Sequence, residues 1–249
     1  MKPESERTMI YCCEAYLALT GNPYLVGKPG GADELVKLLN EAGIQAAMTL
    51  ISGADAANNL TVKHAMEKHP TRIFGMCLVD VRRGKAAVDE FRMTVTECGF
   101  KGLKHSAESD DLVKTAAELG VPVTIHTGGD SWNQQTKAFY EKIAEMAKRY
   151  PDLPIIMEHM GYRYSADLAI EQARRYPNLY LGTTIPAAAE PILVKKAVQE
   201  VGAEKVVFGS NAPFAVASLG VEGIRRLELG NEDEKLVLGG NFERIYRLT

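Results

Sequence analysis

The chain has 249 residues, of which 46% are hydrophobic and 24% charged, and its formal net charge is −3. This composition is typical of a globular protein with a sizeable core, and the interspersed charges do not predict a nucleic-acid surface. No apolar stretch approaches the ~18 residues of a membrane span, and the polar N-terminus lacks a signal core, so the sequence predicts a cytoplasmic protein.

Short apolar runs alternate with longer amphipathic stretches along the whole chain. The apolar runs predict eight strands, at residues 8–15, 45–52, 72–80, 101–107, 122–129, 154–161, 179–185 and 205–211. The amphipathic stretches predict helices at residues 31–43, 61–70, 85–99, 110–120, 136–151, 166–177 and 189–202, and a last helical region at 232–248. Several of these helices end at Gly or before Pro, which are stop signals.

Eight strand–helix units in about 250 residues predict a single (β/α)8 TIM barrel, with residues 1–249 as one domain. An open doubly wound sheet is the alternative, but that fold usually carries a Gly-rich fingerprint after its first strand. The glycines of residues 27–31 come well after the first strand and do not form a G-x-G-x-x-G pattern. No linker or shift in composition divides the chain.

In such a barrel the functional side chains lie at the carboxyl ends of the strands. His126 and His159 end two neighbouring predicted strands, so we expect them to line one pocket. The candidate catalytic residues at strand ends are His126, His159, Lys104 and Glu14. The candidate substrate-binding residues are Tyr16, His105, Thr184 and Asn211.

Five segments, "VPVTIHTGG", "LPIIMEHMGY", "NLYLGTT", "EKVVFGSNAP" and "VLGGNFERIYRL", resemble the amidohydrolase superfamily. The branch they resemble contains carboxymuconate-semialdehyde-type decarboxylases and related metal-dependent hydrolases. The resemblance implies hydrolysis or decarboxylation of a small carboxylate-bearing substrate. It also implies a metal site with an H-x-H pair on strand 1, a strand 5 His matching His126, a strand 6 His matching His159, and a strand 8 Asp.

The sequence departs from that ligand pattern at three positions. Glu14 and Tyr16 stand where the resemblance places the two strand 1 histidines, and Asn211 stands where it places the Asp. An amide has neither the charge nor the basicity of a carboxylate, and a phenol with a pKa near 10 is a poor ligand. We therefore expect a degraded metal site without a cofactor, holding less than about 0.2 equivalents of zinc. If zinc bound, its ligands would be Glu14, His126 and His159.

Lys104 offers a metal-free alternative. An inward lysine in a mostly apolar pocket has a lowered pKa and can form a Schiff base with a carbonyl substrate, as in retro-aldol reactions. The simpler interpretation is that Lys104 anchors a substrate carboxylate or pairs with Glu14 or Glu158. Both interpretations stay open at the level of the sequence.

The cysteines offer a second metal-free alternative. The four of them, Cys12, Cys13, Cys77 and Cys98, form no C-x-x-C or zinc-ribbon spacing, which indicates free thiols. Strand alternation places Cys12 inside the barrel with Glu14 and Tyr16, and Cys13 on the side that faces the helices. A Cys12–His pair would then cleave esters if the thiol were accessible.

Two further expectations concern the pocket and its partners. Small residues in 183–189 and 209–220 predict loops that widen the pocket mouth, a pattern compatible with natural divergence or with engineering. The expected partner is a small molecule, bound either for catalysis or by a barrel without activity. Relatives in this superfamily often dimerise, so a homodimer is also possible.

Overall fold

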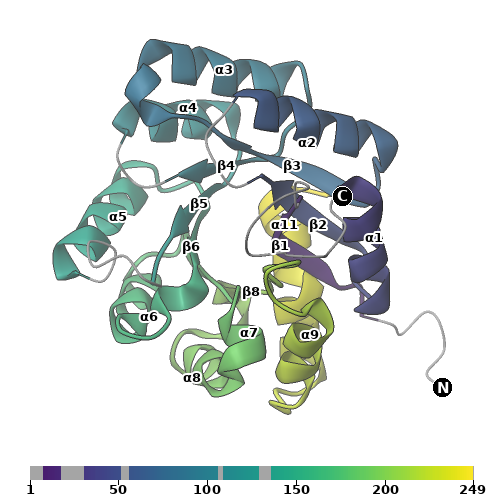
Figure 1. Cartoon of the computed structure of the whole chain (residues 1–249). Helices are drawn as coiled ribbons and strands as arrows, with labels where there is room; N and C mark the ends of the chain where they lie inside the picture. The colour runs from purple at the N-terminus through teal and green to yellow at the C-terminus, as the bar shows by residue number, and fades with distance from the viewer. Residues whose placement is uncertain (1–7, 18–30, 52–55, 106–108, 129–135, 249) are drawn as a thin grey trace.

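A single sheet of eight parallel strands, hydrogen-bonded in chain order from β1 to β8, forms the centre of the molecule, and helices surround it (Figure 1). The computed structural model describes residues 8–17, 31–51, 56–105, 109–128 and 136–248. The strands are β1 (Tyr11–Tyr16), β2 (Ala46–Leu50), β3 (Ile73–Leu78), β4 (Gly102–His105), β5 (Val123–His126), β6 (Ile155–Glu158), β7 (Leu179–Gly182) and β8 (Val206–Val207).

The last strand returns to the first and closes the barrel. The backbone amide of Cys13 donates to the Phe208 carbonyl at 2.8 Å, and the amide of Asn211 donates to the Glu14 carbonyl at 3.1 Å. The predicted (β/α)8 TIM barrel is therefore confirmed, and the alternative of an open doubly wound sheet is wrong.

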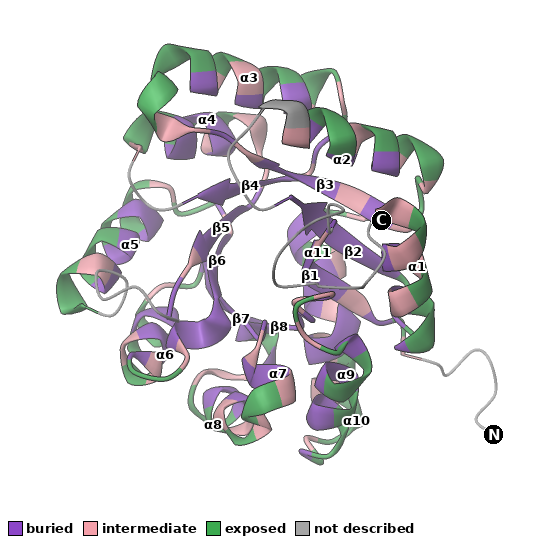
Figure 2. Cartoon of the chain, in the orientation of Figure 1, coloured by how far each residue is buried: buried purple, intermediate pink, exposed green. Residues whose placement is uncertain are grey.

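Helices cover the outside of the strands. Most follow a strand in the βα order that parallel strands require, and the longer ones bury one face against the sheet (Figure 2). They are α1 (Ala32–Glu41), α2 (Ala56–Lys68), α3 (Lys85–Thr96), α4 (Asp110–Leu119), α5 (Lys137–Arg149), α6 (Ala166–Arg175), α7 (Pro186–Ala189), α8 (Pro191–Val201), α9 (Ala217–Arg225), α10 (Asn231–Lys235) and α11 (Asn241–Tyr246). No helix within the described ranges is long and apolar enough to cross a membrane.

Helix α7 and the first residues of α9 lie where the sequence predicted loops of small residues. Gly223 of α9 faces α7 so closely that a Cβ there would lie 1.9 Å from the Ala187 carbonyl oxygen. The small residues in these segments thus allow two helices to approach each other. They do not simply leave the pocket mouth open.

The barrel interior has an apolar end and a polar end. At the amino ends of the strands, Phe242 and Tyr246 of α11 pack against Met48, Met76 and other interior side chains. The polar interior side chains of Glu14, Lys104 and Glu158 gather at the carboxyl ends of β1, β4 and β6. The apolar residues that stabilise the barrel and the polar residues of the candidate site therefore lie at opposite ends of it.

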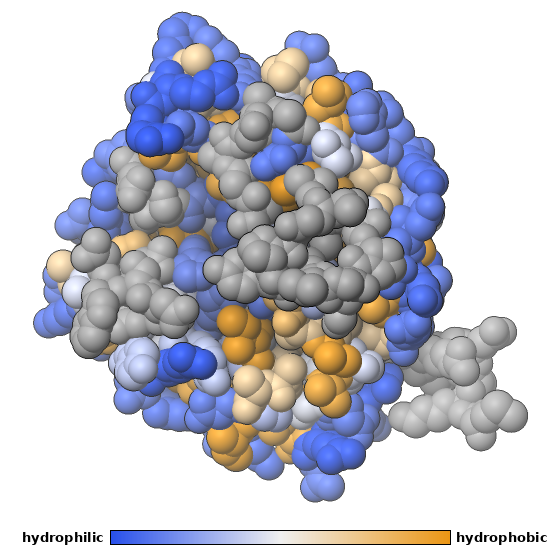
Figure 3. Space-filling view, in the orientation of Figure 1, coloured by the Kyte–Doolittle hydropathy of each residue, from blue (hydrophilic) through white to orange (hydrophobic). Residues whose placement is uncertain are grey.

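Hydrophobic side chains also gather on one part of the surface. In the face shown in Figure 3 they lie over α7 and α9, whereas hydrophilic side chains cover the outer helices. Ile192, Val216 and Leu219 are each more than half exposed. The homodimer expected from the resemblance stays a prediction.

We predict that Asn241→Ala destabilises the end of the barrel at which α11 packs against the amino ends of the strands. The Asn241 side-chain amide is fully buried and donates at 2.8 Å to the carbonyls of Ala203 and Val206. Its loss removes a donor from both carbonyls, of which that of Ala203 still accepts from the Val206 amide. The free energy of unfolding should therefore fall by about 1–3 kcal/mol in urea titrations. Asn231→Ala, at an exposed position, should change it by less than about 0.5 kcal/mol. Equal effects of the two substitutions would contradict this account.

Candidate active site

A buried ammonium group lies between two buried carboxylates at the carboxyl ends of the strands. Lys104 Nζ donates to Glu14 Oε1 at 2.8 Å, to Glu14 Oε2 at 2.7 Å and also to Glu158 Oε2. Glu14 and Glu158 are 0% and 1% exposed, and Lys104 is 9% exposed. The hydroxyl of Tyr16 donates to Glu14 as well. Four side chains from β1, β4 and β6 thus form one charged cluster, which we call the Lys104 cluster.

A bulge in β1 turns Glu14 into this cluster. Cys12 pairs with Ala47 and Ala15 pairs with Thr49, so β1 has one extra residue between these two pairs. Bulges re-aim side chains in this way. As a result Cys13 belongs to the barrel interior, and Cys12 packs between the sheet and the helices. The predicted alternation, with Cys12 inside and Cys13 outside, is wrong.

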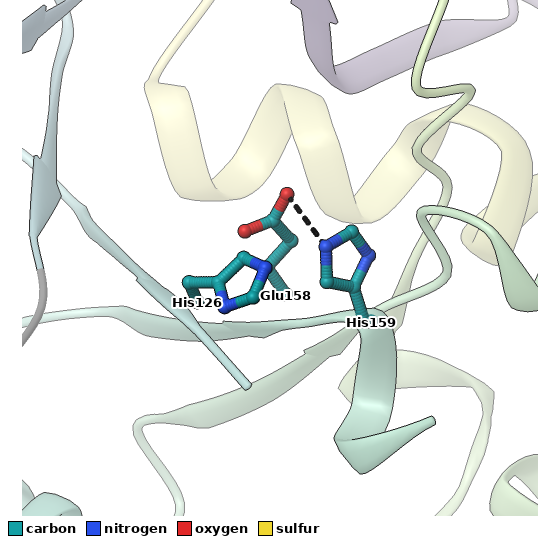
Figure 4. Close-up of side chains that lie close together, drawn as sticks. All are labelled: His126, Glu158 and His159. Carbon is teal, nitrogen blue, oxygen red and sulfur yellow. Dashed lines mark ion pairs between the residues drawn. The ribbon is translucent and has the colours of Figure 1, made fainter. Parts of the chain in front are cut away.

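A second break in alternation brings Glu158 and His159 to the same side. β6 ends at Glu158, and His159 has a φ of +62°, in the left-handed region that few residues other than Gly adopt. The backbone reverses there, so both side chains reach the site (Figure 4), with His159 Nε2 at 3.2 Å from Glu158 Oε1. Strict alternation would have placed them on opposite faces of the strand.

The hydrogen bonds of His159 define where its proton lies. Nδ1 lies 2.9 Å from the Thr184 carbonyl oxygen, which can only accept, so Nδ1 carries a proton. Burial, and then the charge of His126, lower the pKa of His159 to about 4. His159 is therefore a neutral imidazole near pH 7, and Nε2, beside Glu158, is its unprotonated nitrogen.

Burial and neighbouring charges also shift the acids and bases of the Lys104 cluster. Burial, followed by the nearby Glu158 carboxylate, raises the pKa of Glu14 to about 8, although Lys104 acts against this shift. Burial acts to lower the pKa of Lys104, but Glu14 and Glu158 outweigh it and the pKa lies above its usual value. Glu14 is consequently a proton carrier near neutral pH, and Lys104 stays an ammonium group.

These shifts bear on the metal-free alternatives. A Schiff base needs a neutral amine, whereas the two carboxylates hold Lys104 in its charged form. The interpretation that Lys104 pairs with Glu14 or Glu158 is confirmed, because it pairs with both. Cys12 is 0% exposed and burial raises the pKa of its thiol. Its described contacts are the Ser210 hydroxyl at 3.1 Å and backbone groups, so the structure does not support a Cys12–His pair.

A pocket of about 310 Å³ opens beside the Lys104 cluster. Four aliphatic side chains form one part of its wall, and four polar ones form the rest. The aliphatic residues are Leu50, Leu78, Val79 and Val81, and the polar residues are Tyr16, Lys104, His105 and His126. A larger cavity of about 560 Å³ between α2 and α3 lies away from the strand ends.

Both strand-end histidines of β5 and β6 contribute to the site. The rings of His126 and His159 lie edge to face with their centroids 4.7 Å apart, as expected from their neighbouring strands. His126 is half-buried and lines the pocket, whereas His159 is buried behind it. His126 is therefore the imidazole that a bound molecule would meet first.

The remaining predicted residues take different places. His105 lines the pocket, and its Nε2 accepts a hydrogen bond from the Ser109 amide at 3.2 Å. Burial and the charge of Lys142 lower its pKa to about 4, so it is neutral. Asn211 lies beside Glu14 through its backbone amide, with a φ of +57°. Thr184 is fully buried and orients His159 through its carbonyl, while its hydroxyl has no hydrogen-bond partner within the described chain.

Three side chains have donor atoms close enough together to hold a cation. Those of His126, Glu158 and His159 all lie within 4.8 Å of one another. This set contains the two histidines proposed from the sequence, with Glu158 instead of Glu14. Glu158 was not among the predicted site residues, although its place directly before His159 at a strand end was the available signal. The aliphatic pocket wall was also not identified, because apolar strand ends look the same in any barrel.

The sequence of this chain matches a known protein family and resembles a known decarboxylase. A sequence model of the amidohydrolase family matches residues 28–248. The chain is 23% identical, over 87% of both proteins, to a gamma-resorcylate decarboxylase of Polaromonas sp. JS666.

Two solved structures share the fold. One is a dihydroxybenzoic acid decarboxylase from Polaromonas sp. JS666, with bound manganese and the inhibitor 2-nitroresorcinol; its TM-score is 0.78, at 18% identity over 97% of this chain and 98% of that one. The other is a 5-carboxyvanillate decarboxylase from Sphingomonas paucimobilis, with a TM-score of 0.79, at 14% identity over 98% of this chain and 100% of that one.

We predict that Glu14→Gln removes one contribution to the pH dependence of stability. Because the pKa of Glu14 is raised in the folded state to about 8, the native protein holds a proton there that the unfolded chain releases near pH 4.5. This proton makes stability fall as the pH rises from about 5 to 8, by up to roughly 1.4 kcal/mol per pH unit. His105 and His159, whose pKa values are lowered to about 4, act in the opposite direction below about pH 6.5.

Urea unfolding at pH 5 and pH 8 measures this slope. Relative to the wild type, Glu14→Gln should gain stability between pH 5 and pH 8, and Glu145→Gln, at an exposed position of α5, should keep the wild-type slope. An unchanged slope in Glu14→Gln would show that Glu14 releases its proton at an ordinary pH.

Proposed function

Because the chain belongs to the amidohydrolase family, we propose that it is a lyase that removes the carboxylate of a small hydroxylated aromatic acid as CO2. The observation that carries this proposal is the pocket at the strand ends, with an aliphatic wall on one part and acid–base and cationic groups on the rest. The relatives named above are decarboxylases of such acids, which supports the same substrate class.

The size and chemistry of the pocket suit a single aromatic ring. Its volume of about 310 Å³ is near the lower end of the range for small-molecule sites. A ring would contact the side chains of Leu50, Leu78 and Val81, and its polar substituents would face Tyr16 and His126. A ring hydroxyl next to the carboxylate would donate electron density to the ring carbon that takes up the proton.

The reaction exchanges a proton for CO2 at one ring carbon. His126 donates the proton to the carbon that carries the carboxylate, and a ring electron pair forms the new C–H bond. The bond to the carboxylate then breaks, its electron pair restores the aromatic ring, and CO2 leaves. The His159 ring lies edge to face with the His126 ring, and a proton from solvent restores His126 through the open pocket.

Hydrolysis, the other reaction implied by the resemblance, is less compatible with these residues. An attacking water must lose a proton, and the resemblance assigns that step to a strand 8 Asp. This chain has Asn211 at that position, and an amide does not accept a proton near neutral pH. Decarboxylation needs a proton donor instead, and the site contains several.

The residues do not fit a divalent ion such as the manganese bound by the dihydroxybenzoic acid decarboxylase. Both oxygens of Glu14 bind Lys104, and Glu158, the carboxylate of the possible donor set, also binds Lys104. An ammonium group and a divalent ion repel each other, by about 8 kcal/mol for an assumed separation of about 4 Å at an effective dielectric constant of about 20. The mechanism above therefore uses only the side chains of this chain.

We predict that the protein releases CO2 from ortho-hydroxylated benzoic acids. In D2O the product should carry one deuterium at the vacated ring carbon, because the proton comes from a group that exchanges with solvent. NMR of the product and CO2 release measure the two outcomes. Deuterium at any other carbon, or no turnover across a panel of mono- and dihydroxybenzoates, would exclude the proposed reaction.

We predict that His126→Asn lowers kcat by about 100- to 10,000-fold, the usual contribution of a general acid. Asparagine can still form hydrogen bonds at the pocket wall, but its amide cannot donate a proton to the ring carbon near neutral pH. The matched control is His64→Asn, which alters an exposed histidine on α2 and should keep wild-type kcat. Loss of activity by less than tenfold in His126→Asn would assign the proton transfer to another residue.

A further inference from the structure

Lys104 uses all of its donor capacity within the protein. An ammonium group has three N–H bonds, and the structure gives it three carboxylate contacts, two to Glu14 and one to Glu158. All three side chains are at least nine-tenths buried. The group therefore serves as the positive centre that two inward carboxylates need, because isolated charges are not stable in such a place.

The same rim of the barrel is where the resemblance places a divalent ion. The carboxylate of β1 is saturated by Lys104 and Tyr16, and the residue after β8 in the expected ligand position is the neutral Asn211. The site has thus lost ligands and gained a cation. These two changes compensate each other, since the remaining carboxylates keep a positive partner.

From this geometry we infer that the ammonium group of Lys104 is the resident cation of the site, in place of a manganese or zinc ion. Lys104 is a positioning residue: it holds Glu14 and Glu158 together, and Glu158 in turn contacts His159. The inference rests on the proposed function for its substrate, but the binding of metal can be measured without any turnover.

The test measures Mn²⁺ and Zn²⁺ binding by calorimetry and metal content by elemental analysis after dialysis. The wild type should contain less than about 0.2 equivalents of either metal. Lys104→Met removes the ammonium group and leaves Glu14, Glu158, His126 and His159 without a cation. This variant should bind Mn²⁺ at least roughly tenfold more tightly than the wild type, because the oxygens of Glu14 and Glu158 would no longer contact an ammonium group.

Lys205→Met is the matched control. Lys205 is also buried, but its ammonium group binds the carbonyls of Tyr176 and Pro177 at the amino ends of the strands. Its removal should leave Mn²⁺ binding at the wild-type level. A gain of the same size in both variants would overturn the inference, since it would reflect general loosening of the protein.

Two measurements need only the wild-type protein and apply even if Lys104→Met fails to fold. A stoichiometric metal ion that a chelator removes would overturn the inference, as would a rise in melting temperature with micromolar Mn²⁺. A protein without metal, whose melting temperature does not respond to the ion, supports it. Turnover is scored separately: inactivity towards hydroxybenzoates contradicts the proposed function, whereas the metal measurements alone decide the identity of the cation.

Discussion

The ion pair between Lys104 and the two carboxylates constrains the whole functional end of the barrel. It joins β1, β4 and β6, whose positions in the sequence lie far apart. Breaking a buried pair by removing one partner costs about 3–5 kcal/mol, because a charge is left uncompensated. Neither the lysine nor a glutamate can therefore change alone without a large penalty. The pocket wall and the two imidazoles are arranged around this fixed group.

The polar end is supported by an apolar end that does not take part in the chemistry. Helix α11 closes the amino ends of the strands with Phe242 and Tyr246, and Asn241 binds two backbone carbonyls beside them. This arrangement permits the four acidic, basic and phenolic side chains of the Lys104 cluster to be held at the other end. The energy needed to hold them comes from packing in a separate region of the same barrel.

Much of the fold could be predicted from the sequence, because eight apolar runs separated by helical patterns have few other solutions. The proximity of His126 and His159 could also be predicted, since neighbouring strands carry them at the same end. The role of Glu158 and the inverted places of Cys12 and Cys13 could not. Each depends on one local departure from alternation, the β1 bulge or the positive φ of His159, and neither has a distinct sequence signal here.

The direction in which the pKa of Lys104 is shifted could also not be predicted from the sequence. From the sequence, burial alone suggested a lowered value, and burial does act in that direction. The outcome depends on which carboxylates approach the ammonium group, and this is decided in three dimensions by strands that are distant in the chain. The sequence can thus identify the charged residues, but it does not show whether the pKa of Lys104 is raised or lowered.

The β1 bulge carries a consequence for how this lineage can vary. Deletion of Cys13 would restore the regular register, because Glu14 would then pair with Met48 and still face the interior, whereas deletion of Glu14 would remove the acidic side chain. In the second case Lys104 would lose two of its three partners at once. Two single-codon deletions at neighbouring positions of this bulge would therefore differ sharply in effect, although both leave the strand equally long for pairing.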